Sequence, residues 1–269
     1  MSSIVRATPA QKTRRLIVLA ATAFAVIAGQ LQQFGNIGQS PAEFSADSDA
    51  TLRVVGWAFA IWGPIYLGLI AYAIRQALPQ TGESEMINRF GWPSILALVG
   101  IGGWILAAAV DAEIATIVLI FGALSVLIIP MLTNAKLIRG LPRWDRDRWL
   151  VAWPLGALAG WLTIASPVNL LTVATGNGDL PATLAPTVWA LIAVVGVAVF
   201  ALFVTWATRL LAYPLPVAWG LIGVFVAEQD KGNATLAFGA LAFSLIVLGG
   251  ALWITLGLRR SVDRPLVEA

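Results

Sequence analysis

Eight apolar segments run along the chain, separated by shorter stretches that hold nearly all of its charged residues. A helix needs roughly 20 apolar residues, each adding about 1.5 Å, to cross the hydrocarbon core of a bilayer. The apolar segments lie at 16–34, 56–78, 92–110, 114–134, 149–174, 183–208, 213–227 and 233–258. The seventh is the shortest and begins YPLP. This pattern predicts an all-α integral membrane protein, a bundle of about eight transmembrane helices that forms one domain over residues 1–269.

Several connections between these segments are very short. Residues 111–113 join the third and fourth segments, and residues 228–232 join the seventh and eighth. Such short turns place consecutive helices antiparallel and side by side. The connection over 35–55 is longer and mildly acidic. Two interpretations of it stay open: a solvated loop, or a lid over an outward-facing cavity.

The distribution of Lys and Arg predicts how the bundle lies in the membrane, because cytoplasmic loops carry an excess of these residues. With eight crossings and a cytoplasmic N-terminus, only Arg53 and Lys231 of the 17 basic residues fall outside. Seven crossings would move Arg259, Arg260 and Arg264 to the outer side. The pattern therefore favours an even number of crossings with both termini cytoplasmic.

Composition narrows the function further. The chain is 59% hydrophobic and 12% charged, whereas a soluble domain has about 25% charged residues. It contains neither Cys nor His, so thiol chemistry, histidine metal ligands and histidine bases are excluded. Because the basic residues fall in the predicted loops, they indicate orientation in a membrane rather than a nucleic-acid partner. The partner that composition does predict is the lipid bilayer.

No Asp, Glu, Lys or Arg lies near the middle of a predicted span. Charges at that depth usually mark ion paths, proton relays or counter-ions. Their absence argues against a pump, a voltage sensor or a charge-coupled antiporter. The chain also lacks a P-loop and an HExxH motif. We therefore expect neither an enzyme nor a resident cofactor.

The fifth segment is the one with polar groups at depth, in the stretch GWLTIASPVNLL. Thr163, Ser166 and Asn169 are spaced three apart and share a broad helix face. Pro167 cannot donate a backbone hydrogen bond, which leaves the carbonyl of Thr163 without its helical partner. Such groups either hold helices together or line a cavity, and both interpretations stay open.

The chain has twelve Trp residues, and their depth differs. Those near predicted span ends fit the aromatic belt of the membrane interface. Trp62, Trp104, Trp161 and Trp219 lie deeper, where each indole N–H needs an acceptor from protein or ligand. Because these four belong to four different segments, we predict that they converge on one aromatic chamber.

The second segment begins GWAFAIWGPIY. Phe59, Trp62 and Tyr66 form one stripe on a helix face, near Trp57. Pro64 predicts a kink, and Gly56, Gly63 and Gly68 are expected to allow close backbone approach. The stripe is either a packing surface or a wall for a flat, hydrophobic ligand.

Three local patterns resemble those of a known family. GWAFAIWGPIYLGLIAY with the following RQALP is one, and Trp104 in GGWILAAA is the second. The third is a GWxTxAxxxN pattern that starts at Gly160. Together they resemble the tryptophan-rich sensory protein family, the TspO/MBR-like group related to the translocator protein, in its extended bacterial branch. In the five-span members the second-span signature has a different spacing, since Trp62 and Tyr66 here fall one residue early.

The resemblance implies a sensory or transport-like protein of the bacterial inner membrane, with tetrapyrroles or sterol-like molecules as family ligands. Without His, a porphyrin would be held here by stacking and hydrogen bonds. We expect the ligand to be bound by Trp57, Phe59, Trp62, Tyr66, Trp104, Trp161, Thr163, Ser166, Asn169 and Trp219.

Two alternative functions stay open. A weak similarity between residues 56–64 and 160–167 would suit the internal repeat of a secondary transporter for a small neutral or organic solute. A ligand-free structural or assembly factor would instead fill the space where the deep Trp residues meet. Glycine-rich faces are compatible with a homodimer and equally with packing inside one chain.

Overall fold

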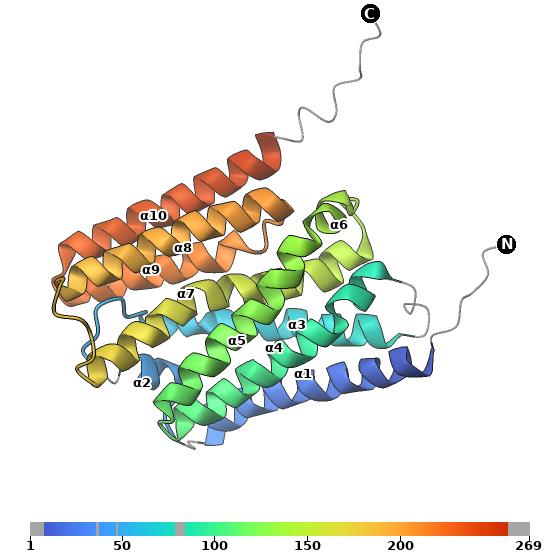
Figure 1. The fold of residues 1–269 in the computed structure, drawn as a ribbon, viewed down its shortest axis with the longest axis horizontal. Coiled ribbons are helices and arrows are strands. Elements are labelled where there is room, and N and C mark those ends of the chain that lie inside the picture. Colours follow the sequence, from blue (N-terminus) through green and yellow to red (C-terminus); the bar gives the residue numbers. More distant parts are fainter. Residues whose placement is uncertain (1–7, 36–37, 47, 79–83, 258–269) are drawn as a thin grey trace, which may run out of the picture.

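The computed structural model describes residues 8–35, 38–46, 48–78 and 84–257, without the side chains of 33–35, and these residues contain helices and no strand (Figure 1). The α-helices are α1 (Pro9–Gly35), α2 (Pro41–Ala46), α3 (Trp62–Ala77), α4 (Glu85–Ala109), α5 (Glu113–Thr133), α6 (Ala135–Gly140), α7 (Trp153–Gly176), α8 (Pro186–Thr208), α9 (Pro214–Asp230) and α10 (Ala234–Leu252). A 3-10 helix, η1 (Gly56–Ile61), precedes α3, and the π-helical turns η3 (Arg148–Ala152) and η4 (Trp253–Gly257) flank α7 and α10.

Within the described residues, seven helical stretches are long and apolar enough to cross a membrane. They are Pro9–Gln32, Gly56–Ala77, Glu85–Ala109, Glu113–Thr133, Arg148–Gly176, Pro186–Thr208 and Ala234–Gly257. The all-α membrane fold is therefore confirmed. The predicted seventh span corresponds to α9, which has 17 residues and is not among the seven.

The second predicted span is not one continuous α-helix. Residues 56–61 form the 3-10 helix η1, and the α-helix begins at Trp62. Pro64 lies in the first turn of α3, where a backbone N–H has no partner within the helix. The kink at Pro64 stays a prediction, and what the structure shows is a change in helix type just before it.

The C-terminal end of α9 and the N-terminal end of α1 also differ from the sequence-based expectation. Glu228, expected in a loop, belongs to the last turns of α9 and is fully buried. Arg14 and Arg15, expected in a cytoplasmic loop, lie in α1 and are buried as well. Arg14 donates to Asn88 Oδ1 at 2.7 Å, and such hydrogen bonds allow a charged group to be buried.

Helix α7 lies at the centre of the bundle. About 72% of the most apolar part of the stretch Arg148–Gly176, which contains α7, is buried inside the protein. The corresponding share is 33–50% for the other six long stretches. In Figure 1, α8, α9 and α10 pack together on one side of α7, and α5, α4 and α1 lie on the other. Gly160 permits the close contact with the start of α9, since a Cβ there would lie 2.0 Å from the Tyr213 carbonyl oxygen.

Candidate functional site

An aromatic cluster joins η1, α3 and α7. Trp161 contacts Phe59 and Trp62 edge to face, with ring centroids 5.8 and 6.4 Å apart. Trp62 also stacks on Tyr66 at 5.1 Å. These geometries are the favourable ones for aromatic pairs. The stripe predicted on the second span therefore faces the deep Trp of α7.

Next to this cluster lies a small space of about 40 Å³, the central cavity. Its lining is almost entirely apolar and includes the expected residues Phe59, Trp62, Trp104, Trp161 and Asn169. A volume of this size holds water but no organic ligand of the predicted kind. In this part of the protein the deep Trp residues mainly pack against their neighbours.

A second, larger space of about 520 Å³, the aromatic pocket, is also lined by Phe59 and Trp62. It is lined by Gly29, Gln30, Gln32, Ser40, Pro41, Ala42, Gly56, Trp57, Phe59, Ala60, Trp62, Gly63, Tyr66 and Ile105. Its size falls in the range of small-molecule sites. Aromatic rings form one wall, and amide groups of α1 supply polarity.

Glycines make room in and beside the aromatic pocket. Cβ atoms added at Gly56 and Gly63 would meet nothing within 4 Å, so the expected close backbone approach at these two positions is wrong. They leave open space instead. A Cβ at Gly29 would lie 2.6 Å from the Tyr66 hydroxyl oxygen, so this glycine admits the Tyr66 ring against α1.

Asn169 connects three elements at the edge of the central cavity. Its Oδ1 accepts a hydrogen bond from Trp104 Nε1 at 2.9 Å, and its Nδ2 donates to Thr116 Oγ1 at 3.0 Å. Thr116 Oγ1 in turn donates to the Glu113 carbonyl oxygen at 2.6 Å. The chain of hydrogen bonds satisfies the deep indole and ties α4 and α5 to α7.

Thr163 and Ser166 line neither space. Thr163 Oγ1 donates to the Ala159 carbonyl at 2.8 Å and lies 2.7 Å from the Tyr213 hydroxyl. Ser166 Oγ donates to the Leu162 carbonyl at 2.7 Å. The Ser166 hydroxyl is therefore used within α7, and only Thr163 makes a contact to another element, through Tyr213.

Trp219 is also separate from the other deep Trp residues. It lies on α9, is 36% exposed, and contacts Trp57 edge to face at 5.1 Å. Its Nε1 donates to the Ala58 carbonyl oxygen at 2.8 Å. Trp219 thus contacts η1 without lining either space. In total, seven of the ten expected residues line the two spaces.

Residues 38–46 and 48–55, which we call the roof, cover both spaces. Within the roof, Ser40 and Glu43 cap α2 reciprocally: the Glu43 N–H donates to Ser40 Oγ at 3.1 Å, and the Ser40 N–H donates to Glu43 Oε2 at 2.7 Å. Phe44 packs against Trp104 at 5.9 Å. Because residues of this segment line both spaces, its described part is not a freely solvated loop, and the lid stays a prediction.

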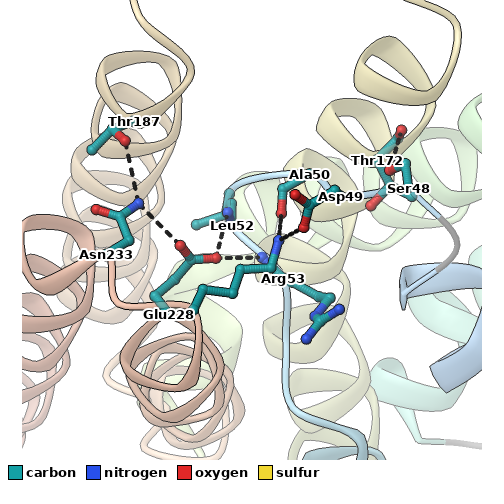
Figure 2. A network of polar contacts seen from close by, with 10 residues as sticks. Ser48, Asp49, Ala50, Leu52, Arg53, Thr172, Thr187, Glu228 and Asn233 are labelled. Atoms are coloured by element: carbon teal, nitrogen blue, oxygen red, sulfur yellow. Dashed lines mark hydrogen bonds and ion pairs between the residues drawn. The ribbon is translucent and has the colours of Figure 1, made fainter.

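Polar contacts fix the far end of the roof to α9 and α7 (Figure 2). Glu228 Oε1 accepts from the backbone N–H groups of Leu52 and Arg53 at 3.2 and 3.3 Å. Lys231 Nζ contacts Asp49 Oδ1 at 2.7 Å and donates to the Ala50 carbonyl at 2.8 Å. Ser48 is not part of this group, because its hydroxyl donates to the Thr172 carbonyl of α7 at 2.8 Å.

The hydrogen bonds of the roof lower the pKa values of two carboxyl groups. The backbone and side chain of Ser40 lower the pKa of Glu43. The hydrogen bond and charge of Lys231 lower the pKa of Asp49. In the part of the chain that the structure describes, no three His, Cys, Asp or Glu residues gather in a way that would hold a metal ion.

Several residues at the two spaces were missed by the sequence reasoning. Gln30 and Gln32 lie in the first predicted span and were not among the expected ligand-binding residues, although both line the aromatic pocket and Gln32 is buried. The Ser-Pro-Ala-Glu stretch at 40–43 is a helix-start signature that would have revealed α2. No local pattern marks Thr116, because its partner Asn169 is 53 residues away.

The family model of the TSPO-like proteins matches residues 15–253. No curated protein and no solved structure matches the chain. The matched range runs from α1 to the start of η4 and contains the roof and every residue that lines the two spaces. It confirms the resemblance found in the sequence: this membrane protein belongs to the TSPO-like protein family.

Proposed function

We propose that this TSPO-like protein binds a flat, hydrophobic ligand of the tetrapyrrole class in the aromatic pocket. The observation that carries the proposal is the 520 Å³ space bounded by Trp57, Trp62 and Tyr66 on one side. Aromatic faces stack on planar ligands, while Gln30 and Gln32 offer hydrogen bonds to a polar edge. The role is binding or transport rather than catalysis.

The central cavity serves a different purpose in this proposal. At about 40 Å³ it is too small for such a ligand, so Trp104 and Trp161 act as a packed back wall. This filled region is the feature that the alternative of a ligand-free structural factor would predict. That alternative leaves the aromatic pocket without a purpose, which is why we favour ligand binding.

The proposed setting is the inner membrane of a bacterium, with eight crossings and both chain ends cytoplasmic. A 17-residue α9 is about 25 Å long, close to the hydrocarbon thickness of roughly 30 Å. It lies beside α8 and α10 over most of its length (Figure 1). The aromatic pocket then lies in the outer half of the membrane.

Titration of the purified protein with protoporphyrin IX, followed by quenching of Trp fluorescence, tests the binding proposal. We expect saturable quenching that weakens at least about tenfold in Trp62→Leu, since one stacking face is lost. Trp144→Leu is the control, because Trp144 is 79% exposed on the connection before η3. Non-saturable quenching, or equal affinity in both variants, would refute binding at this pocket.

A further inference from the structure

We infer that Glu228 and Lys231 position the roof, and that this pair, the α9 clasp, sets the rate at which ligand enters and leaves the aromatic pocket. The inference rests on the proposed ligand binding but concerns a different part of the molecule. No residue of α9 lines the aromatic pocket or the central cavity. Any effect of the clasp on ligand must therefore pass through the roof.

Glu228 is the main anchor of the clasp. Its side chain is fully buried, and none of the ion pairs among the described residues includes it. Its carboxylate depends instead on hydrogen bonds: Leu52 and Arg53 donate to Oε1, and Asn233 Nδ2 donates to Oε2 at 3.1 Å. A buried carboxylate is costly unless such bonds stay formed. Opening the roof would remove two of these donors, which favours the closed arrangement.

Figure 2 shows how the clasp is itself braced. Asn233 lies on the side of Glu228 opposite to the roof and donates a second hydrogen bond, to Thr187 Oγ1 at 3.2 Å. Thr187 belongs to the first turn of α8, and Asn233 caps α10 by accepting from the Leu236 N–H. Glu228 thus connects the roof to all three C-terminal helices.

The roof backbone is strained at the point where Glu228 holds it. Leu52 has a φ of 75°, a left-handed conformation that bulky residues rarely adopt. Strain of this kind persists only when the surroundings enforce it. Here the Glu228 carboxylate accepts a hydrogen bond from the Leu52 N–H, and the Leu52 side chain is 1% exposed. Without the carboxylate, Leu52 would return to a more common backbone conformation, and the roof would move.

Lys231 supplies the second contact of the clasp. It binds the Ala50 carbonyl and the Asp49 carboxylate, which lie two and three residues before the strained Leu52. A backbone bond from the Val55 N–H to the Gly223 carbonyl at 3.2 Å fastens the end of the roof to α9. The start of the roof is held elsewhere, by the Gln39 N–H on the Ala109 carbonyl at 3.3 Å. Residues 40–46 between these anchors cover both spaces.

Stopped-flow mixing with protoporphyrin IX tests the clasp in Glu228→Gln and Lys231→Met. We expect release at least about tenfold faster in Glu228→Gln, because a neutral amide oxygen accepts more weakly from the Leu52 and Arg53 N–H groups and the new NH2 group faces the Asn233 Nδ2 donor. Lys231→Met should show a smaller increase in the same direction. Glu85→Gln is the matched control, since Glu85 forms an exposed pair with Arg89 on α4. Release rates within twofold of the control in both clasp variants would overturn the inference.

A reversible cross-link provides the opposite perturbation. The chain contains no Cys, so Asp49→Cys and Lys231→Cys introduce the only two thiols. Bridging them with a short bis-methanethiosulfonate reagent should slow both entry and release several-fold, and a reductant should restore the original rates. Unchanged rates on bridging would contradict a clasp that controls exchange.

Hydrogen exchange separates failure of the clasp from failure of the binding proposal. Without any ligand, Glu228→Gln should exchange the amides of Leu52 and Arg53 at least about tenfold faster than Glu85→Gln does. Faster exchange without porphyrin binding would refute the proposed function and leave the roof anchor standing. Porphyrin binding with unchanged amide exchange would refute the clasp alone.

Discussion

At the scale of single residues, the hydrogen bonds of Asn169 stabilise the centre of the bundle. Trp104 Nε1 is buried, and Asn169 Oδ1 is its acceptor. Thr116 uses the other end of the same amide. A deep indole without an acceptor would carry a free-energy penalty that neither lipid nor the apolar lining of the central cavity can offset.

Replacement of this amide should therefore be costly. We expect Asn169→Leu to lower the free energy of unfolding by about 1–3 kcal/mol, because it leaves the Trp104 N–H unpaired. Asn177→Leu is the matched control, as Asn177 makes an exposed bond to Glu113. Thermal melting in detergent measures both. A melting temperature for Asn169→Leu equal to that of the control would contradict the assigned role.

The sequence predicted that each deep indole N–H needs a hydrogen-bond acceptor, but not which group accepts. For Trp104 the acceptor is a side chain on α7, and for Trp219 it is the Ala58 carbonyl of η1. Thr163 and Ser166 resemble Asn169 in spacing, yet both hydroxyls bond to carbonyls one turn earlier in α7. A short hydroxyl side chain reaches its own helix, whereas an Asn amide reaches across to another. Spacing alone does not contain this difference.

At the scale of elements, the roof is held together by the cap of a six-residue helix. Ser40 and Glu43 exchange hydrogen bonds around the first turn of α2, with Pro41 between them. A helix this short has little stability of its own. The cap and the contact of Phe44 with Trp104 therefore maintain α2 over the two spaces.

The cap should respond to mutation and to pH. Ser40→Ala should speed amide exchange in α2 several-fold, because the Glu43 N–H loses its acceptor.

The pH dependence follows from the pKa of Glu43, which is lowered in the folded protein. The Glu43 carboxylate therefore stabilises α2 above its unfolded pKa of about 4, and this stabilisation is lost as the pH falls below that value. Hydrogen exchange, corrected for its intrinsic pH dependence, should show constant α2 protection from pH 8 to about 5 and a decline near pH 4. Equal protection in Ser40→Ala would contradict the cap.

Hydrophobic pattern predicted the positions of the long helices to within a few residues, except at the start of α1 and α4. Both begin with polar turns, such as PAQKTRR in α1, which a search for apolar runs omits. The pattern also did not predict η1, whose Ala58 carbonyl accepts a hydrogen bond from the distant Trp219 of α9. Element boundaries that rest on such distant contacts lie outside local reasoning.

At the scale of the whole molecule, the number of membrane crossings determines where the roof and the clasp lie. In the part of the chain that the structure describes, seven helical stretches have spanning length, and α9 is shorter. If α9 crosses, Ala182 before α8 and Asp230 at the end of α9 lie on the same side, opposite to Arg146. If it does not, Asp230 joins Arg146.

Labelling of single cysteines in intact cells should decide this, because the natural chain has none. A membrane-impermeant maleimide should label Ala182→Cys and Asp230→Cys, and it should label Arg146→Cys only after the cells are opened. All three positions are on the exposed surface of connections or helix ends. Protection of Asp230→Cys together with Arg146→Cys would show seven crossings.

The most direct test of ligand binding in the aromatic pocket is to fill that pocket without disturbing the fold. Gly63 lines it and has open space around its missing side chain; Gly122 of α5 has equally open space but lines neither the pocket nor the central cavity. Fluorescence titration with protoporphyrin IX should therefore show an affinity at least about tenfold weaker for Gly63→Leu, and unchanged for Gly122→Leu. Equal affinities in a folded Gly63→Leu protein would contradict the proposed site.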